Sequence, residues 1–407
     1  MSQMKDNSVA IFHSNDLMPK NADQEMGFKQ NSDLFHLCGI DQEETVLLIQ
    51  KDHKAVKEVL FIRETNEHIK VWEGEKLSKE KASGISSIYE IHWNSDFKKI
   101  LTKKIDETSI IYLNSNEHPR ANIVVESRDK RFANWLTKKF PNKTIRKAPD
   151  ILYPIRAIKG DEEVKLIKHA CDITHLGVKK VLKKLRPGIY EYELEAHIMH
   201  EFILNRASFA YAPIIASGDN ACILHYGANN QLCKDGDIIL MDFGAEYANY
   251  ASDLTRCFPV NGRFTKRQKR VYNSVLSVMK QAKKLLRPGV SLANYETHVG
   301  KIMEKELVDL GLISMKDIAE SKEAPAYKKY YMHGTSHHIG LDVHDVSGPN
   351  QTLSEGMVLT CEPGIYIPEE GLGIRLENDI FIGAETNTDL MEDIPIEADE
   401  IEDLLNI

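Results

Sequence analysis

The sequence predicts an α/β (α+β) fold in two parts, a small N-terminal α/β domain and a larger domain made of one α/β unit used twice. The chain has 407 residues, enough for two domains with a core each. Apolar runs of β type alternate with helical stretches over the first 150 residues. From about residue 156 onward, two pairs of segments repeat in the same order. We therefore predict one domain at 1–150 and a second at 156–407.

The N-terminal part contains four short apolar runs that predict the strands of a sheet. They are SVAIF (8–12), TVLLI (45–49), EVLFI (58–62) and SIIYL (109–113). The stretch SRDKRFANWLTKKF (127–140) predicts a helix. FKQNSDLFHLCGI (28–40) leaves two interpretations open, either a loop that lies at the domain edge or faces substrate, or a core strand with a turn.

The segment PNKTIRKAPDILYPIRAIKG (141–160) is interpreted as the linker between the domains. It contains three prolines and several basic residues, and it lacks a long periodic pattern of apolar positions.

The C-terminal part repeats itself. KDGDIILMDFGAEY (234–247) matches LSEGMVLTCEPGIY (353–366) when Gly236 is aligned with Gly356, and this places Asp242 on Glu362. Upstream of each copy lies a helix that ends in Arg-Pro-Gly and leads into a second helix, at 181–198 and 282–299. Two matches in the same order favour a duplicated unit over coincidence.

Four acids follow from this duplication. Asp253 comes eleven residues after Asp242, and Glu377 comes fifteen residues after Glu362, so each copy carries a pair. The His-rich segment HGTSHHIG (333–340) lies between the two pairs. Paired acids that face each other repel unless a cation lies between them. The sequence therefore predicts a metal site of oxygen ligands plus one imidazole.

Such a ligand set is large enough for two divalent ions held through shared carboxylates. Oxygen ligands with a single imidazole favour Mn²⁺ or a similar ion over a thiolate zinc site. A water shared by two such ions loses its proton near neutral pH and becomes a nucleophile, which points to hydrolysis.

Four histidines are candidates for the imidazole ligand and for proton transfer: His225, His333, His337 and His344. Each of them, taken alone, is more often a buried core residue than a functional one. Their common position beside the acid cluster favours function. His338, adjacent to His337, is interpreted as structural or as a lining residue.

Composition excludes several classes of protein. The net charge of −9 argues against nucleic acid or an anionic membrane as the main partner. The longest apolar runs fall short of the roughly 20 residues of a membrane span, and the first residues lack the pattern of a signal peptide. Six scattered cysteines without a CxxC pair suit a reducing compartment, so we expect a cytoplasmic protein.

Four motifs in this order make the chain similar to a known family. They are MDFGAEYANYASDLTRCFPVNG (241–262), HGTSHHIGLDVHD (333–345), LSEGMVLTCEPGIY (353–366) and GIRLEND (373–379). With them the chain resembles the metallopeptidases of the pita-bread fold, and among these aminopeptidase P and prolidase. QNSDLFHLCGI (30–40) resembles a segment of the family's creatinase-type domain. The resemblance implies a creatinase-type N-terminal domain and a pita-bread catalytic domain with pseudo-twofold symmetry.

The resemblance also implies which residues hold metal. Asp253 and Glu377 would bridge two ions, and Glu362 would both bind metal and carry protons in catalysis. The implied metal ligands are Asp242, Asp253, His337, Glu362 and Glu377.

The remaining candidates fall on positions that contact the substrate in the family. His225, His333 and His344 match histidines that orient the substrate and stabilise the tetrahedral intermediate, so the resemblance makes them catalytic and substrate-binding. Arg375 matches an arginine that supports the site and is assigned to substrate binding. The alternative for Arg375 is a plain surface position on a strand.

The function implied by this resemblance is metal-dependent hydrolysis of the bond before proline, which releases the N-terminal residue of Xaa-Pro peptides. That bond is a tertiary amide without an N–H and with restricted geometry, so a dedicated pocket makes chemical sense. A prolidase restricted to dipeptides is the closest alternative. A non-catalytic binding module of the same fold is disfavoured, because all five ligand positions hold residues able to bind metal. We also expect two divalent ions, most simply Mn²⁺, and a homo-oligomer of two or four chains.

Overall fold

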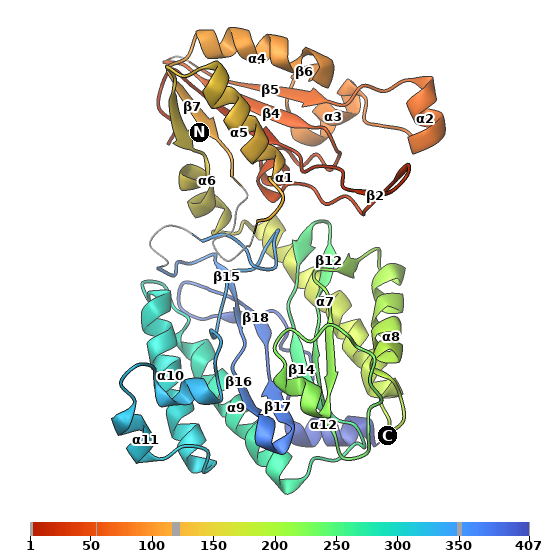
Figure 1. Cartoon of the computed structure of the whole chain (residues 1–407), viewed down its shortest axis with the longest axis vertical. Helices are drawn as coiled ribbons and strands as arrows, with labels where there is room; N and C mark the ends of the chain where they lie inside the picture. The colour runs from red at the N-terminus through yellow and green to blue at the C-terminus, as the bar shows by residue number, and fades with distance from the viewer. Residues whose placement is uncertain (1–2, 54, 116–122, 348–351, 407) are drawn as a thin grey trace. The chain divides into compact units, whose positions relative to one another are not determined.

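The structure is a computed structural model that describes residues 3–53, 55–115, 123–347 and 352–406. Contacts within the chain divide it into two compact units, Met1–Arg156 and Ala157–Ile407. Each unit is described by itself below (Figure 1).

The first unit is built on a six-stranded mixed sheet with the strand order β6-β5-β4-β1-β7-β8. Neighbours β1, β4 and β5 run antiparallel, whereas β5–β6, β1–β7 and β7–β8 are parallel pairs. All four predicted strands are confirmed, as β1, β4, β5 and β7. The strands of this sheet are β1 Ser8–His13, β4 Val46–Lys51, β5 Val56–Ile62, β6 Glu90–Trp93, β7 Ile110–Leu113 and β8 Thr144–Lys147.

Helices cover both faces of this sheet. Successive side chains on a strand point to opposite faces, so each face presents an apolar surface for helices to pack on. Val9 and Ile11 of β1 belong to one apolar cluster, and Ala10 and Phe12 belong to the other. The first cluster is completed by α4 Phe97–Asp106 and α5 Arg128–Lys139, and the second by α1 Ser32–Cys38, α3 Lys79–Ser86 and α6 Pro149–Arg156. Helix α5 confirms the helix predicted at 127–140. Smaller elements of the unit are β2 Pro19–Asn21, β3 Gln24–Glu25, α2 Glu67–Glu73 and η1 Asn94–Asp96.

Both interpretations of 28–40 are wrong, because this segment contains helix α1. The Asn31 side chain accepts hydrogen bonds from the backbone N–H groups of Asp33 and Leu34 and so caps the helix. Gly39 ends it in the left-handed conformation, with φ of 66°. These local hydrogen bonds start and stop a helix that is too short to show a clear period in the sequence.

The interpretation of 141–160 as a linker is also wrong for most of its length. It contains β8, which pairs with β7, and α6, whose Leu152 is buried in the core of the first unit. Pro149 stands at the first position of α6, where a missing N–H leaves no helical bond unmade, whereas Pro154 stands inside this short helix and removes one helical hydrogen bond.

The second unit consists of helix pairs and short strands in two successive sets. In Figure 1, α7 and α8 lie on one side of the strands and α9 and α10 on the other. The helices are α7 Asp161–Lys184, α8 Glu191–Leu204, α9 Lys266–Leu285, α10 Leu292–Asp309, α11 Met315–Glu320 and α12 Ala398–Leu405. The strands are β9 Ser208–Phe209, β10 Ile214–Ser217, β11 Ile238–Asp242, β12 Ala245–Tyr247, β13 Tyr250–Ala251, β14 Thr255–Pro259, β15 Val358–Cys361, β16 Gly364–Ile367, β17 Leu372–Arg375, β18 Asn378–Phe381 and β19 Thr388–Asp389. Short 3-10 turns are η2 Gly218–Cys222, η3 Ala326–Lys329 and η4 Pro368–Glu370.

The predicted duplication is visible in the backbone. Gly236 and Gly356 both have φ of 86°, in the left-handed region that favours glycine. The N–H of Gly188 donates to the carbonyl of Cys233 at 2.9 Å, and the equivalent N–H of Gly289 donates to Leu353 at 2.9 Å. Equivalent turns therefore make equivalent hydrogen bonds in the two halves.

The two halves meet along β14 and the segment between β17 and β18. The N–H of Glu377 donates to the carbonyl of Thr255 at 3.1 Å. The guanidinium of Arg256, fully buried, donates to the carbonyl of Glu377 at 2.8 Å. Residues about 120 positions apart are thus held side by side, which brings the acids of both halves into one place.

Candidate metal centre

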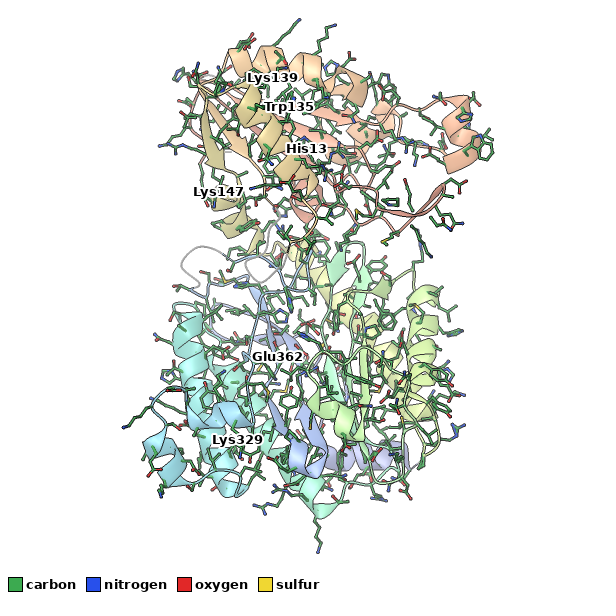
Figure 2. All side chains as sticks on the ribbon, in the orientation of Figure 1. His13, Trp135, Lys139, Lys147, Lys329 and Glu362 are labelled. Atoms are coloured by element: carbon green, nitrogen blue, oxygen red, sulfur yellow. The ribbon has the colours of Figure 1, made fainter. Side chains whose placement is uncertain are left out.

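Each half delivers one acid at the end of a buried strand. All five residues of β11 are buried, and the strand ends at Asp242. The four residues of β15 are likewise buried, and Glu362 follows the last of them. Figure 2 labels Glu362, which lies among the central strands of the second unit. The apolar strand fixes the backbone, so the acid at its end has little positional freedom.

Each half delivers a second acid from the next strand turn. Asp253 follows the β12–β13 hairpin, whose turn residues Ala248 and Asn249 have φ of 49° and 69°. A turn with two such residues matches the twist of adjoining strands. Glu377 lies between β17 and β18. Both carboxylates are buried, with exposed fractions of 5% for Asp253 and 2% for Glu377.

His337 points its imidazole at these acids. Its Nδ1–H can donate to the carbonyl of His338 at 3.0 Å, which leaves Nε2 as the unprotonated nitrogen when the ring is neutral. The Nε2 atom lies 3.5 Å from Asp253 Oδ2 and 3.7 Å from Glu362 Oε1. Among the described residues, ligand atoms of Asp253, His337 and Glu377 lie within 4.8 Å of one another.

Arg375 and two hydroxyl groups hold the acids in place. Arg375, which is 4% exposed, binds the second oxygen of Asp242 and donates from Nε to Thr255 Oγ1 at 3.0 Å. Thr255 Oγ1 in turn donates to Glu377 Oε2 at 2.6 Å. The Tyr211 hydroxyl contacts Asp242 Oδ1 at 2.6 Å and also binds Asp253 Oδ1. Arg375 is therefore buried inside the centre, so its alternative as a plain surface residue is wrong.

Tyr211 and Thr255 are site residues that the sequence did not single out, and Tyr366 is a third. The Tyr366 hydroxyl accepts from Arg375 Nη1 at 2.9 Å and lies 2.7 Å from His333 Nε2. Thr255 and Tyr366 stand inside the recognised motifs at 241–262 and 353–366, which is the only sequence signal that could have found them. Tyr211 lies outside every motif.

The charge balance of the cluster calls for a cation. Burial raises the pKa of Glu362 to about 7, although His337 and Arg375 act in the opposite direction. Burial and the neighbouring Asp253 raise the pKa of Glu377 well above its ordinary value, and burial also raises that of Asp242. Burial alone would lower the pKa of the His337 imidazole, but Asp253 and Glu362 raise it to about 9. Acids that resist ionisation together, beside an imidazole turned toward them, fit a site for divalent metal ions.

The other predicted histidines surround this cluster at different depths. His333 Nδ1 lies 3.6 Å from Glu362 Oε2, and burial lowers the pKa of this imidazole to about 3, so the ring is neutral at pH 7. The ring of His344, an exposed residue, lies 4.5 Å from the ring of His337. His225 is exposed in the segment after η2. His338 is 4% exposed, and its Nδ1 has no hydrogen-bond partner among the described residues. The metal-binding and substrate-binding roles of these residues stay predictions.

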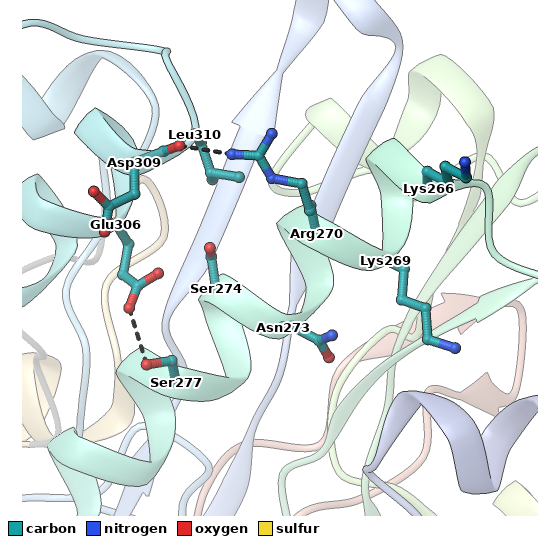
Figure 3. Close-up of a pocket in the computed structure, with 9 residues that line it drawn as sticks. All are labelled: Lys266, Lys269, Arg270, Asn273, Ser274, Ser277, Glu306, Asp309 and Leu310. Carbon is teal, nitrogen blue, oxygen red and sulfur yellow. Dashed lines mark hydrogen bonds between the residues drawn. The ribbon is translucent and has the colours of Figure 1, made fainter.

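A separate hollow of about 560 Å³ lies between α9 and α10 (Figure 3). It is lined by Lys266, Lys269, Arg270, Asn273, Ser274, Ser277, Glu306, Asp309 and Leu310. None of these residues belongs to the acid–imidazole cluster, and the lining includes cations as well as acids. The hollow therefore has no part in the metal centre.

Two family models match the chain. The model described as Metallopeptidase family M24 matches residues 165–384, a range that contains all five predicted ligands. The model described as Aminopeptidase P, N-terminal domain matches residues 1–112. The predicted order of an N-terminal domain of this type and a catalytic domain of the pita-bread metallopeptidases is thereby confirmed.

Individual relatives match the chain from end to end. The Xaa-Pro aminopeptidase of Haemophilus influenzae is 35% identical, over 100% of this chain and 95% of the relative. The Xaa-Pro aminopeptidase of Escherichia coli is also 35% identical, with the same coverage. A solved structure of zinc-substituted E. coli aminopeptidase P in complex with product superposes with a TM-score of 0.88 at 33% identity, over 99% of this chain and 95% of that chain.

Proposed function

The chain belongs to metallopeptidase family M24, and from that premise we propose that it is a metal-dependent Xaa-Pro aminopeptidase. It hydrolyses the peptide bond before proline and releases the N-terminal residue. The observation that carries this proposal is the convergence of four acids and one imidazole, two acids from each half, in a chain that covers 95% of the Xaa-Pro aminopeptidases it resembles.

The match to an aminopeptidase P N-terminal domain and the end-to-end coverage favour this activity over that of a dipeptidase. A binding module without catalysis is disfavoured, because all five predicted ligand positions hold residues with donor atoms, and those of Asp253, His337, Glu362 and Glu377 lie close to one another.

The residues that would hold two divalent ions are Asp242, Asp253, His337, Glu362 and Glu377. Oxygen donors with a single imidazole support Mn²⁺ as the physiological metal. When bound, such ions polarise a carbonyl and make water acidic enough to supply a nucleophile near neutral pH.

Glu362 and His333 are suited to different tasks in this reaction. The Glu362 carboxylate lies 3.6 Å from His333 Nδ1 and 3.7 Å from His337 Nε2, between a proposed metal ligand and a histidine proposed to contact substrate, so Glu362 is proposed as the general base and acid. The neutral His333 ring is oriented by the Tyr366 hydroxyl at 2.7 Å and is proposed to contact the substrate carbonyl. His225 and His344 are exposed and are proposed to line the substrate path. Arg375 contributes by holding Asp242 and Tyr366 in position.

We further propose that the protein acts in the cytoplasm as a homo-oligomer of two or four chains. All six cysteines are free thiols, which supports a reducing compartment. Among the described residues, no helix has the length and apolar character of a membrane span. Peptides with proline in the second position are the proposed partners, and neither nucleic acid nor membrane is proposed as one.

The test is product analysis by mass spectrometry with protein that has been stripped of metal and reloaded with Mn²⁺. Matched substrates are Xaa-Pro, Xaa-Pro-Yaa and Xaa-Ala-Yaa peptides. We expect metal-dependent release of Xaa from Xaa-Pro-Yaa, and no release from the alanine peptide. Cleavage of the dipeptide alone would make the protein a prolidase. No cleavage of either proline peptide by metal-loaded protein would refute the proposal.

A further inference from the structure

The helices that follow the two Pro-Gly turns carry a glutamate at the same position. The offset of 101 residues that aligns these turns places Glu195 of α8 on Glu296 of α10. Neither glutamate belongs to the metal centre. Glu195 Oε2 accepts from Asn229 Nδ2 at 2.9 Å, in the segment that follows η2, and Glu296 binds Thr335 in the His-rich segment. Equivalent acids therefore hold a histidine-bearing segment in each half.

Glu296 makes the more extensive of these contacts. Its Oε1 accepts from the backbone N–H of Thr335 at 2.8 Å, and its Oε2 accepts from the Thr335 hydroxyl at 3.0 Å. The Tyr331 hydroxyl lies 2.7 Å from Thr335 Oγ1, and Thr335 is completely buried. The Thr335 carbonyl then accepts from the backbone N–H of Glu362 at 2.8 Å. Glu296 is thus joined to the backbone of Glu362 through a single residue.

The residue before Glu296 adds a second connection between α10 and the site. The Tyr295 hydroxyl lies 3.0 Å from Ser336 Oγ, which can donate to it, and 3.7 Å from Cys361 Sγ. Ser336 precedes the predicted ligand His337, and Cys361 precedes the predicted ligand Glu362. Two successive residues of one helix therefore hold the backbone segments of two predicted ligands.

We propose that Glu296 is a positioning residue for the hydrolysis, holding segment 333–337 in register with Glu362. This inference rests on the proposed function. Without the Glu296 carboxylate, the N–H and the hydroxyl of Thr335 lose their acceptors inside the protein, and the segment must shift to satisfy them. The imidazole of His333 moves with it, away from its contact with the Tyr366 hydroxyl. Misplacement of a reacting group by about 1 Å costs about 100-fold in rate.

The variant Glu296→Ala tests this proposal, with Glu306→Ala as its matched control. Glu306 lies on the same helix ten residues further on, and its Oε1 accepts from the Ser277 hydroxyl at 2.9 Å, at the hollow shown in Figure 3. Both substitutions remove a carboxylate that binds a hydroxyl, and only one of them touches the His-rich segment. Glu296→Gln keeps one acceptor oxygen for the Thr335 N–H and serves as the conservative variant.

Two independent readouts are needed, kcat and KM on an Xaa-Pro-Yaa peptide, and amide hydrogen exchange of metal-free protein. For Glu296→Ala we expect a fall in kcat of about 10- to 100-fold with a smaller change in KM. We also expect faster exchange in peptides that span 330–340 and 356–366. Glu306→Ala should match the wild type in both readouts, and Glu296→Gln should recover part of kcat.

Equal kcat for the two alanine variants, or unchanged exchange in Glu296→Ala, would overturn the proposal. If Glu296→Ala does not fold, the same comparison is made with Glu296→Gln, for which wild-type kcat and exchange would overturn it. Should the wild type itself leave Xaa-Pro-Yaa intact, the proposed function has failed. The exchange of Thr335 and Glu362 then still decides whether Glu296 holds the segment.

Discussion

Replacing Asp253 with asparagine removes a charge from the metal centre and leaves the shape of the side chain unchanged. In the metal-free protein this has two opposite effects, because Asp253 attracts a protonated His337 and repels Glu377. In the metal-loaded protein it has one effect, since an amide oxygen is a much weaker ligand for a divalent ion than a carboxylate oxygen. The same substitution should therefore act very differently with and without metal.

The two effects in metal-free protein are of similar size. At an effective dielectric constant of about 20, charges separated by the 3.5 Å between Asp253 Oδ2 and His337 Nε2 attract by about 5 kcal/mol. At a separation of 4.8 Å or less, the repulsion between Asp253 and an ionised Glu377 amounts to about 3–4 kcal/mol or more, and this repulsion contributes to the raised pKa of Glu377. The free energy of unfolding of metal-free protein should therefore change by only about 1–2 kcal/mol.

Metal binding contributes more than this difference. An ion present at 100 times its Kd stabilises the folded protein by about 2.7 kcal/mol, and two ions by about 5 kcal/mol. For a unit of this size that corresponds to a rise in Tm of about 10 °C or more. The variant should lose most of this rise.

The assay is thermal unfolding of wild type and Asp253→Asn after chelation and again with saturating Mn²⁺. Asp309→Asn, at the exposed C-terminal end of α10, is the matched control and should behave as the wild type. If Asp253→Asn shows the full metal-dependent rise in Tm, or retains wild-type turnover, Asp253 is not a ligand and the reasoning fails.

Three further predictions concern the surroundings of the centre. Thr255→Val removes one hydrogen bond from the buried Glu377 carboxylate and one from the buried Arg375 guanidinium, each worth about 1.5–3 kcal/mol. Urea unfolding of metal-free protein should show a loss of about 3 kcal/mol or more in the free energy of unfolding. An unchanged unfolding midpoint would contradict these hydrogen bonds. Burial raises the pKa of Glu362 from 4.5 to about 7, so the folded metal-free protein binds this proton more tightly than the unfolded chain does. The resulting stabilisation is fully present below pH 4.5 and is lost as the pH rises through about 7. Because protons compete with metal, Mn²⁺ affinity measured by calorimetry should rise over the same range, and less steeply in Glu362→Gln; equal slopes would count against this carboxyl as a ligand. Gly244→Ala would place a methyl group against the backbone carbonyl of Ser252 and should lower the free energy of unfolding by about 3 kcal/mol, whereas Gly227→Ala meets open space and should cost little. Similar unfolding midpoints for the two variants would show that the hairpin backbone shifts to make room for the methyl group.

The sequence was sufficient for the parts of the protein that are repeated. Asp242 and Glu362 each end a run of apolar residues behind a glycine turn, and both runs form buried strands. One such match has many explanations, but two in the same order constrain the backbone of both halves. The convergence of the four acids follows from this symmetry, together with the pairing of β14 and the Glu377 segment.

The hydrogen-bonding partners of the acids could not be predicted in the same way. Tyr211 lies outside the duplicated segments, yet its hydroxyl contacts Asp242 and Asp253. Under the offset of 120 residues, Tyr366 stands opposite Glu246, so the repeat gives no second tyrosine to match it. Hydroxyl side chains are common in every sequence, and tertiary packing alone decides which of them reach a buried carboxylate.

Local signals also failed where short elements depend on capping and packing. Helix α1 has only seven residues, so its apolar positions do not establish a period, and the hydrogen bonds of Asn31 define its start. Prolines suggested a linker at 141–160, but Pro149 occupies the first position of helix α6, which tolerates proline, and the helix accommodates Pro154 in its interior. Weak propensities of this kind are overridden once a segment can bury apolar side chains against an existing sheet.

Metal bound at the seam between the two halves would link them mechanically. Asp242 and Asp253 lie on one side of that seam, and Glu362 and Glu377 lie on the other, so ions held between the two pairs would cross-link segments more than 100 residues apart. Separation of the halves pulls the ligand set apart, and loss of the ion leaves like charges facing each other across the joint. The rate at which metal leaves the protein therefore reports how often the two halves separate. Metal release to a chelator would measure this opening in the absence of substrate.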